Sequence, residues 1–134
     1  MSRLYCVLFL AATAAGCSNS PTTPITPTTP GTVQETFGGT LTKSGGATHP
    51  FAVGRAGSVT VALTTVAPDS TLVVGLSLGT WNGTSCQAVL AKDNAVQGST
   101  LLGTASTAGN LCVRIYDVGF LVGSITYQID VVHP

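Results

Sequence analysis

The sequence predicts an all-β domain, an antiparallel β-sandwich of about eight short strands, and three observations predict it. Hydrophobic residues alternate with small or polar ones in one segment after another. Gly, Pro, Asn and Asp turn signals separate these segments, and no helical period is found after residue 33. The whole chain has 134 residues, which is enough for one domain.

Charged residues are scarce, and this excludes several classes of protein. They make up 7% of the chain, and the five Lys and Arg residues balance the five Asp and Glu residues. A nucleic-acid-binding protein needs clustered cations to neutralise phosphates, so no nucleic-acid partner is expected. A charge-rich disordered chain is excluded for the same compositional reason.

Residues 1–16 have the pattern of a signal peptide. Arg3 precedes an apolar stretch, Leu4 to Ala15, that is too short to span a hydrocarbon core of ~30 Å. The sequence Ala14-Ala15-Gly16-Cys17 then resembles a bacterial lipobox, with Ala14 where Leu is usual. This resemblance implies cleavage before Cys17 and acylation of Cys17, which would hold the protein in membrane lipid. The alternative is an ordinary secretory signal with an unrelated cysteine near the cleavage site.

Residues 17–32 are predicted to be the lipidated cysteine and a Pro/Thr-rich tether. Prolines recur at every third position, at Pro21, Pro24, Pro27 and Pro30. Proline removes N–H donors and favours polyproline II, so the segment is expected to form an extended spacer that reaches about 45 Å. Ser18 after the cysteine, in place of Asp, points to an outer-membrane lipoprotein of the bacterial cell envelope.

Residues 33–134 are expected to form the sandwich domain. The clearest alternation predicts strands at Ser58–Thr64, Leu72–Gly79, Leu111–Tyr116 and Ile125–Val131. Weaker patterns predict strands at Thr36–Lys43, His49–Val53, Cys86–Ala91 and Ser99–Ala105. A sandwich of two antiparallel sheets is the architecture that such a series of short strands favours.

Two cysteines remain in the mature domain, because Cys6 lies in the signal peptide and Cys17 is assigned to lipid. An exported domain folds under oxidising conditions, so a disulfide between Cys86 and Cys112 is predicted. The closed loop of about 27 residues would stabilise the fold by roughly 3.5 kcal/mol. Neither a metal site nor a cofactor is predicted, because there is no Cys-x-x-Cys and the two histidines lack ligand spacing.

Five segments resemble the bacterial pre-peptidase C-terminal (PPC-like) domain. They are Phe37-Gly38-Gly39-x-Leu41, His49-Pro50-Phe51-x-Val53, and the runs at 57–63, 112–119 and 125–131. The resemblance implies a jelly-roll-like sandwich that accompanies secreted enzymes as a non-catalytic accessory.

A possible catalytic serine is found at Ser77 and is not supported by its context. Residues 75–79 match Gly-x-Ser-x-Gly, and Asp93, Asp117 or Asp130 followed by His133 would complete a Ser, Asp, His order. A nucleophile elbow needs a helix after the serine, whereas strand alternation continues through Ser77. Ser77 is therefore predicted to be an outward-facing strand residue, and no catalytic residue is expected.

Three residues are candidates for ligand binding. Trp81 stands beside the Asn82-Gly83 turn, where an exposed indole would stack on a sugar. The favoured alternative is that Trp81 caps the end of the core near Cys86. Tyr116 and Asp117 end a strand and complete the candidate set. Loop oxygens of Asp69, Asp93, Asn94 and Asp117 are a weak calcium candidate, because no dense acidic loop exists.

These observations predict a lipid-anchored, non-catalytic binding or structural module of the cell envelope. Its expected partners are membrane lipid, through acylated Cys17, and either a glycan or another exported protein. The alternative is an accessory subunit or inhibitor that docks on an exported protein such as a peptidase. An envelope hydrolase with an unrecognised site is the third hypothesis.

Overall fold

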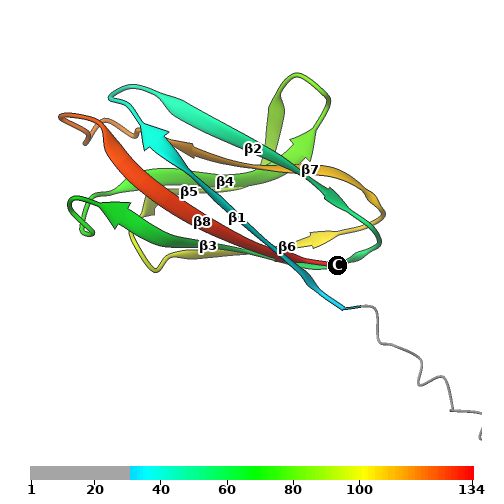
Figure 1. Ribbon diagram of the computed structural model, residues 1–134. Coiled ribbons are helices and arrows are strands. Elements are labelled where there is room, and N and C mark those ends of the chain that lie inside the picture. Colours follow the sequence, from blue (N-terminus) through cyan, green and yellow to red (C-terminus); the bar gives the residue numbers. More distant parts are fainter. Residues whose placement is uncertain (1–30) are drawn as a thin grey trace, which may run out of the picture.

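Eight antiparallel strands form two four-stranded sheets in the computed structural model, which describes residues 31–134 (Figure 1). The strands are β1 (Val33–Leu41), β2 (Gly46–Val53), β3 (Gly57–Ala67), β4 (Val74–Trp81), β5 (Cys86–Ala95), β6 (Thr100–Ala105), β7 (Gly109–Tyr116) and β8 (Ile125–His133). The predicted eight-stranded antiparallel sandwich is confirmed. The predicted signal peptide, Cys17 and most of the tether lie outside the described residues.

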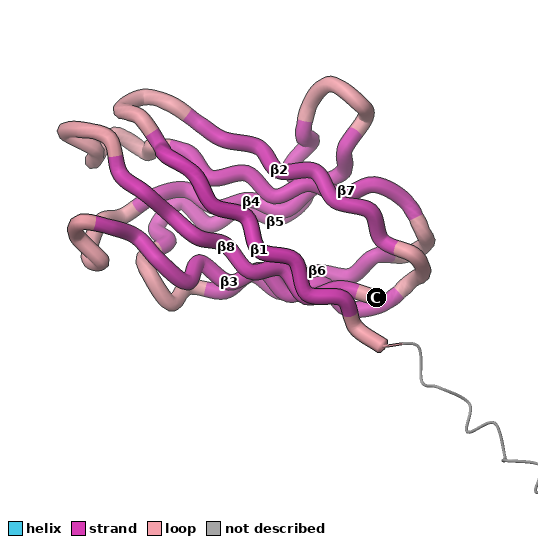
Figure 2. The backbone as a smooth tube through the Cα atoms, in the orientation of Figure 1, coloured by secondary structure: helices cyan, strands magenta, loops and turns pink. Residues whose placement is uncertain are grey.

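The strand order is β1-β8-β3-β6 in the first sheet and β2-β7-β4-β5 in the second. Strand and loop are the only structures along the described backbone (Figure 2), so it offers no helix of the length and apolarity that crossing a membrane requires. The edge strands β1 and β2 contact each other along one side of the sandwich, and the edge strands β5 and β6 do so along the other.

The core lies between the two sheets and is built by the alternation that the sequence shows. In β3 the inward residues Val59, Val61 and Leu63 are fully buried, and in β8 Ile129 and Val131 are as well. Full burial of such a side chain contributes about 2 kcal/mol relative to its exposure. The same alternation gives β2, β4 and β7 their inward faces.

Strand β4 departs from simple alternation, and the predicted outward exposure of Ser77 is wrong. Ser77 is 3% exposed, because β4 is a central strand whose outer face is also covered. A Cβ atom on Gly75 would lie 2.0 Å from a ring carbon of Tyr116, and one on Gly79 would lie 2.0 Å from the carbonyl oxygen of Gln87. The placement of Ser77 in the middle of a strand is confirmed.

Strand register separates the loops into two poles. Val33 pairs with His133 and Leu41 pairs with Ile125, so the start of β1 and the start of β8 lie at opposite ends. We call the end with Val33 and the loops 54–56, 82–85 and 106–108 the tether pole, and the end with the loops 42–45, 68–73 and 117–124 the distal pole (Figure 1). Nine residues of β1 at ~3.4 Å each place the poles about 30 Å apart.

The predicted disulfide between Cys86 and Cys112 is confirmed. It links β5 to β7, the two strands that flank β4, and its sulfur atoms are 2.01 Å apart. Cys86 begins β5 directly after the 82–85 hairpin loop, and Asn82 accepts hydrogen bonds from the backbone N–H groups of Thr84 and Ser85 in that loop. The bridge therefore holds the β4–β5 hairpin against the centre of its sheet at the tether pole.

Replacing Cys86 and Cys112 together by alanine is expected to lower the free energy of unfolding by about 2–4 kcal/mol, because the unfolded chain regains the entropy of the closed loop. Urea denaturation of the purified domain measures this change. Wild-type protein in reducing agent should lose a similar amount. Equal stability of the double variant and the oxidised wild type would contradict the prediction.

Candidate functional site

The three residues predicted to bind a ligand lie at opposite poles. Trp81 ends β4 at the tether pole, whereas Tyr116 and Asp117 follow β7 at the distal pole. Trp81 is half-buried, pairs with Cys86 and borders a shallow depression of about 540 Å³ together with Pro50 and other residues. A single site that contains all three side chains is therefore not formed.

Asp117 braces the loop that follows β7. Its carboxylate accepts hydrogen bonds from the backbone N–H groups of Gly119 at 2.8 Å, Phe120 at 3.2 Å and Leu121 at 3.3 Å. The other carboxylate oxygen accepts one from the N–H of Ser44, at 2.7 Å. These bonds, with those from Ser44 and Gly119 foremost, lower the pKa of Asp117. Both oxygens of the Asp117 carboxylate thus accept hydrogen bonds from the backbone of two neighbouring loops.

Residues 117–123, which we call the distal loop, present two apolar side chains to solvent. Val122 is 95% exposed and Phe120 is 62% exposed, while Leu121 between them is buried and anchors the loop in the core. Gly119 has a φ of 106°, a left-handed conformation that favours glycine. The brace and the anchor together hold Phe120 and Val122 outward on an ordered backbone.

Tyr116 supports the outer surface beside this loop. Its hydroxyl donates a hydrogen bond to the carboxylate of Asp93, and its ring covers Gly75. Burial together with this bond to Asp93 raises the pKa of Tyr116 to about 12. The Arg114 guanidinium lies 5.2 Å from the ring centroid, a cation–π distance. Tyr116 thus joins β7 to β5 on the outer face of the sheet.

The residues of the possible Ser, Asp, His order are not assembled. Ser77 lies in the β2-β7-β4-β5 sheet, paired with Arg114 and Ala91. His133 lies in the other sheet at the tether pole, where its Nε2 is 3.2 Å from the carboxylate of Glu35. Towards the distal pole, Asp93 accepts a hydrogen bond from Tyr116, and Asp117 accepts hydrogen bonds from backbone N–H groups. Asp130 accepts a hydrogen bond from Thr36.

A cluster of rings that the sequence reasoning missed closes the β1/β2 side of the sandwich. The His49 ring stacks on Phe37 with centroids 5.0 Å apart, and its Nε2 is 2.6 Å from the hydroxyl oxygen of Tyr127. Phe51 contacts Phe37 and the ring of His133. Burial lowers the pKa of His49 and raises that of Tyr127. The alternation of hydrophobic residues predicts that these residues lie in strands. It does not predict their contacts with one another, because the contacting residues are far apart in the sequence.

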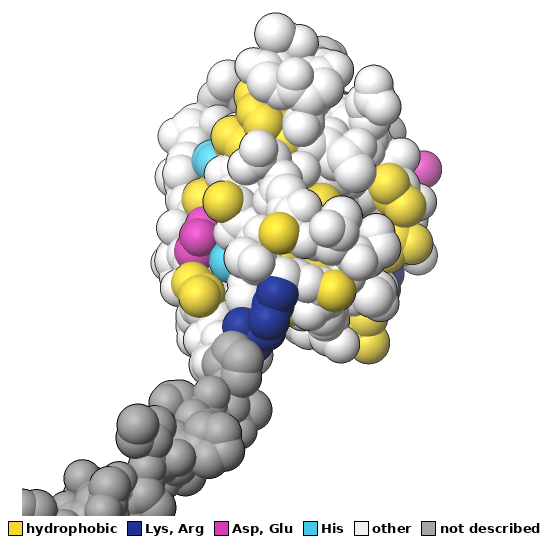
Figure 3. All heavy atoms as spheres, turned by 90° about the vertical axis from the view of Figure 1, so that its right-hand side faces the viewer, with side chains coloured by type: hydrophobic (Ala, Val, Ile, Leu, Met, Phe, Trp, Pro, Cys, Tyr) yellow, Lys and Arg dark blue, Asp and Glu magenta, His cyan; other side chains and the backbone are white. Residues whose placement is uncertain are grey.

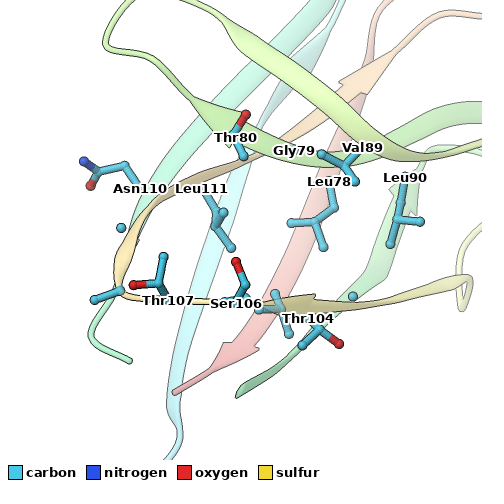
Figure 4. Close-up of a pocket in the computed structure, with 15 residues that line it drawn as sticks. Leu78, Gly79, Thr80, Val89, Leu90, Thr104, Ser106, Thr107, Asn110 and Leu111 are labelled. Atoms are coloured by element: carbon cyan, nitrogen blue, oxygen red, sulfur yellow. The ribbon is translucent and has the colours of Figure 1, made fainter. Parts of the chain in front are cut away.

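On the β5/β6 side a groove of about 340 Å³ lies between the two sheets, and the sequence reasoning also missed it (Figure 4). Its lining residues come from β3–β7 and the β6–β7 turn, and none is charged. They are Val59, Leu78, Gly79, Thr80, Val89, Leu90, Gly103, Thr104, Ala105, Ser106, Thr107, Ala108, Gly109, Asn110 and Leu111.

The calcium candidates are dispersed. The Asp69 carboxylate accepts hydrogen bonds from the backbone and hydroxyl of Thr71, which lower its pKa, and Asp93 and Asp117 have the partners already given. Among residues 31–134, no three His, Cys, Asp or Glu side chains are grouped so as to hold a metal ion.

Comparison with known proteins identifies a similar fold. No family model matches the chain, and no curated sequence matches it significantly. A solved structure that resembles it is PliG from Aeromonas hydrophila, a periplasmic inhibitor of g-type lysozyme. The TM-score is 0.52 at 12% identity, and the match covers 75% of this chain and 86% of that protein. At this identity the likeness shows a shared β-sandwich fold.

Acidification is expected to destabilise the protein through His49. Its pKa is lower in the folded protein than the ordinary value of 6.5, so the unfolded chain binds the proton more readily. The contribution of His49 is complete above pH 6.5 and declines as the pH falls below that value. Urea denaturation of wild type and His49→Gln at a series of pH values measures this difference. A pH profile that is as steep in the variant as in the wild type would assign the loss to other groups.

Proposed function

We propose that the chain is a membrane-tethered, non-catalytic module that docks on another exported protein through the distal loop. The observation that carries this proposal is the brace at Asp117, which holds Phe120 and Val122 exposed on an ordered loop. Isolated exposed hydrophobic residues are common on protein surfaces. Phe120 and Val122, however, lie on either side of the buried Leu121 on a single ordered loop. This arrangement suits burial of both side chains against a partner protein better than contact with solvent.

Order in the loop favours binding because it reduces the entropy lost when the complex forms. A mobile loop must be immobilised at the interface, at a cost of about 0.5–1.5 kcal/mol for each flexible side chain. The distal loop already has its backbone N–H groups bonded to Asp117 and its Leu121 side chain buried. Phe120 is aromatic, and aromatic residues including phenylalanine are enriched in the buried centres of protein interfaces.

The position of the loop suits a tethered protein. The described chain begins at the tether pole, and the distal loop lies at the other end of the sandwich (Figure 1). An acylated Cys17 and an extended tether of about 45 Å would therefore turn the distal loop away from the lipid surface. In this arrangement the module meets partners in the envelope space, as the predicted outer-membrane lipoprotein would.

An exported enzyme is the partner class that we favour. PliG, which has a similar fold, is a periplasmic inhibitor of g-type lysozyme, and the PPC-like resemblance suggests an accessory of secreted enzymes. Charged residues make up 7% of the chain and sum to no net charge, and few charged side chains are seen on the tether pole, the end opposite the distal loop (Figure 3). Recognition through apolar contacts is consistent with this composition, whereas attraction by charge is not.

Binding is expected to depend on Phe120 and Val122. The full chain is used to capture proteins from an envelope extract and is assayed against purified lysozymes and exported peptidases. Phe120→Ser/Val122→Ser should weaken binding at least about tenfold, since the apolar contacts of both exposed side chains are removed. Leu102→Ser is the matched control, because Leu102 is 73% exposed on β6, away from the distal loop.

The control should bind like the wild type, and the affinity should change little between low and moderate salt. Undiminished binding by the distal-loop variant would overturn the proposed docking surface. A steep loss of affinity with salt would show that charge dominates.

Lipid anchoring has a separate test. Wild-type protein should incorporate labelled palmitate and sediment with the membrane, whereas Cys17→Ser should incorporate none and either leave the membrane fraction or accumulate as precursor. Absence of label in the wild type would exclude acylation and leave an ordinary secretory signal.

A further inference from the structure

The edge strands of the two sheets meet along two sides of the sandwich, and the space between the sheets is filled differently on each side. This difference draws attention to the β5/β6 side as a ligand site. On the β1/β2 side, Phe37, His49, Phe51 and Tyr127 fill the space between the edge strands. On the β5/β6 side, the turn from Ala105 to Gly109 carries only small side chains, and the groove of about 340 Å³ remains between the sheets. This volume lies at the lower end of the range for small-molecule sites, about 300–1,000 Å³.

The apolar wall of the groove is made by side chains that reach from the β2-β7-β4-β5 sheet towards β6. Leu78, Leu90 and Leu111 point into the gap in Figure 4. Gly103 allows this approach, because a Cβ atom there would lie 2.6 Å from Leu78 Cδ2 and 3.3 Å from Leu90 Cδ1. The groove therefore has a close-packed leucine wall on one side, and on the other side the small inward residues Gly103 and Ala105 of β6.

A β-bulge adds Val89 to the mouth of the groove. Leu78 pairs with Leu90 and Gly79 pairs with Ala88, so Val89 is the extra residue of β5. Its side chain is 71% exposed although it borders an apolar cavity. Bulges on edge strands redirect side chains in this way beside binding sites.

Polar groups in the groove are uncharged and gather towards one end. Ser106, Thr107 and Asn110 lie where the β6–β7 turn closes the groove (Figure 4). Their hydroxyl and amide groups donate and accept hydrogen bonds, but none of the lining residues neutralises a charge. Ser106, Thr107 and Asn110 are exposed, and no lining residue offers an ionic headgroup a counterion there. A neutral headgroup is compatible with this end.

We infer that the groove binds one unbranched acyl chain of a neutral amphiphile. The chain lies against Leu78, Leu90 and Leu111, and the uncharged head meets Ser106 and Thr107 at the β6–β7 turn. This site is separate from the distal loop, and the inference stands without the proposed docking function. It assigns a ligand class to a surface that neither the predicted site residues nor the fold similarity indicates.

A homologous series of 1-monoacylglycerols, from hexanoyl to hexadecanoyl, tests the inference by calorimetric titration of the folded domain below the micelle concentration. Affinity should rise about fourfold with each added methylene and stop rising once the groove is full. The fatty acid of the same chain length should bind more weakly at neutral pH. Affinity that is independent of chain length, or tighter binding of the fatty acid, would overturn the inference.

Two variants locate the site. Val89→Asp places a charge at the groove mouth and should reduce affinity at least tenfold. Its matched control is Leu102→Asp, since Leu102 has a similar exposure of 73% but does not line the groove. Ala108→Phe fills the end of the groove at the β6–β7 turn without adding charge and should also abolish binding. Folding of each variant is checked by thermal unfolding. Normal binding by a folded Ala108→Phe, or equal losses in the two Asp variants, would place the ligand elsewhere.

Discussion

The pairing of β1 with β8 is the constraint on which the arrangement of the molecule depends. It runs unbroken from Val33 opposite His133 to Leu41 opposite Ile125, and it brings the first and last strands of the domain side by side. The start of the described chain is thereby fixed at one pole and the β7–β8 connection at the other. This register places the distal loop at the end of the sandwich opposite Val33, where the first strand begins.

The sequence predicted the strands well because each strand carries its own signal. Alternation marks β3, β4, β7 and β8 directly, and turn residues delimit the weaker strands. The disulfide was predictable because Cys86 and Cys112 are the cysteines left once Cys6 and Cys17 are assigned to the predicted signal peptide and the lipobox-like sequence. What alternation does not encode is the order of strands within a sheet. For this reason the central position of β4, and with it the burial of Ser77, was missed.

The candidate site was less predictable than the fold, since its parts depend on contacts between distant segments. Asp117 was singled out as a ligand contact, and it instead accepts hydrogen bonds from its own loop and from Ser44, 73 residues away in the sequence. The nearby Phe120 and Val122 have no periodic pattern that distinguishes them from core residues. The groove arises where the end of β6 and the following turn carry small residues, from Gly103 to Gly109, and the space that they leave exists only when the opposing sheet is in place.

The groove and the distal loop lie far enough apart that binding at one need not affect binding at the other. The groove lies in the half of the sandwich near the tether pole, whereas the distal loop is anchored through Leu121 at the other end. Coupling between two binding sites requires an element with two arrangements that both ligands influence. Strands β4 and β7, which run from one end to the other, pair without a register shift, and the core between the sheets is close-packed, so both resist such a change. The two surfaces are therefore best understood as independent, so that an acyl ligand in the groove leaves the affinity of the distal loop for its partner unchanged.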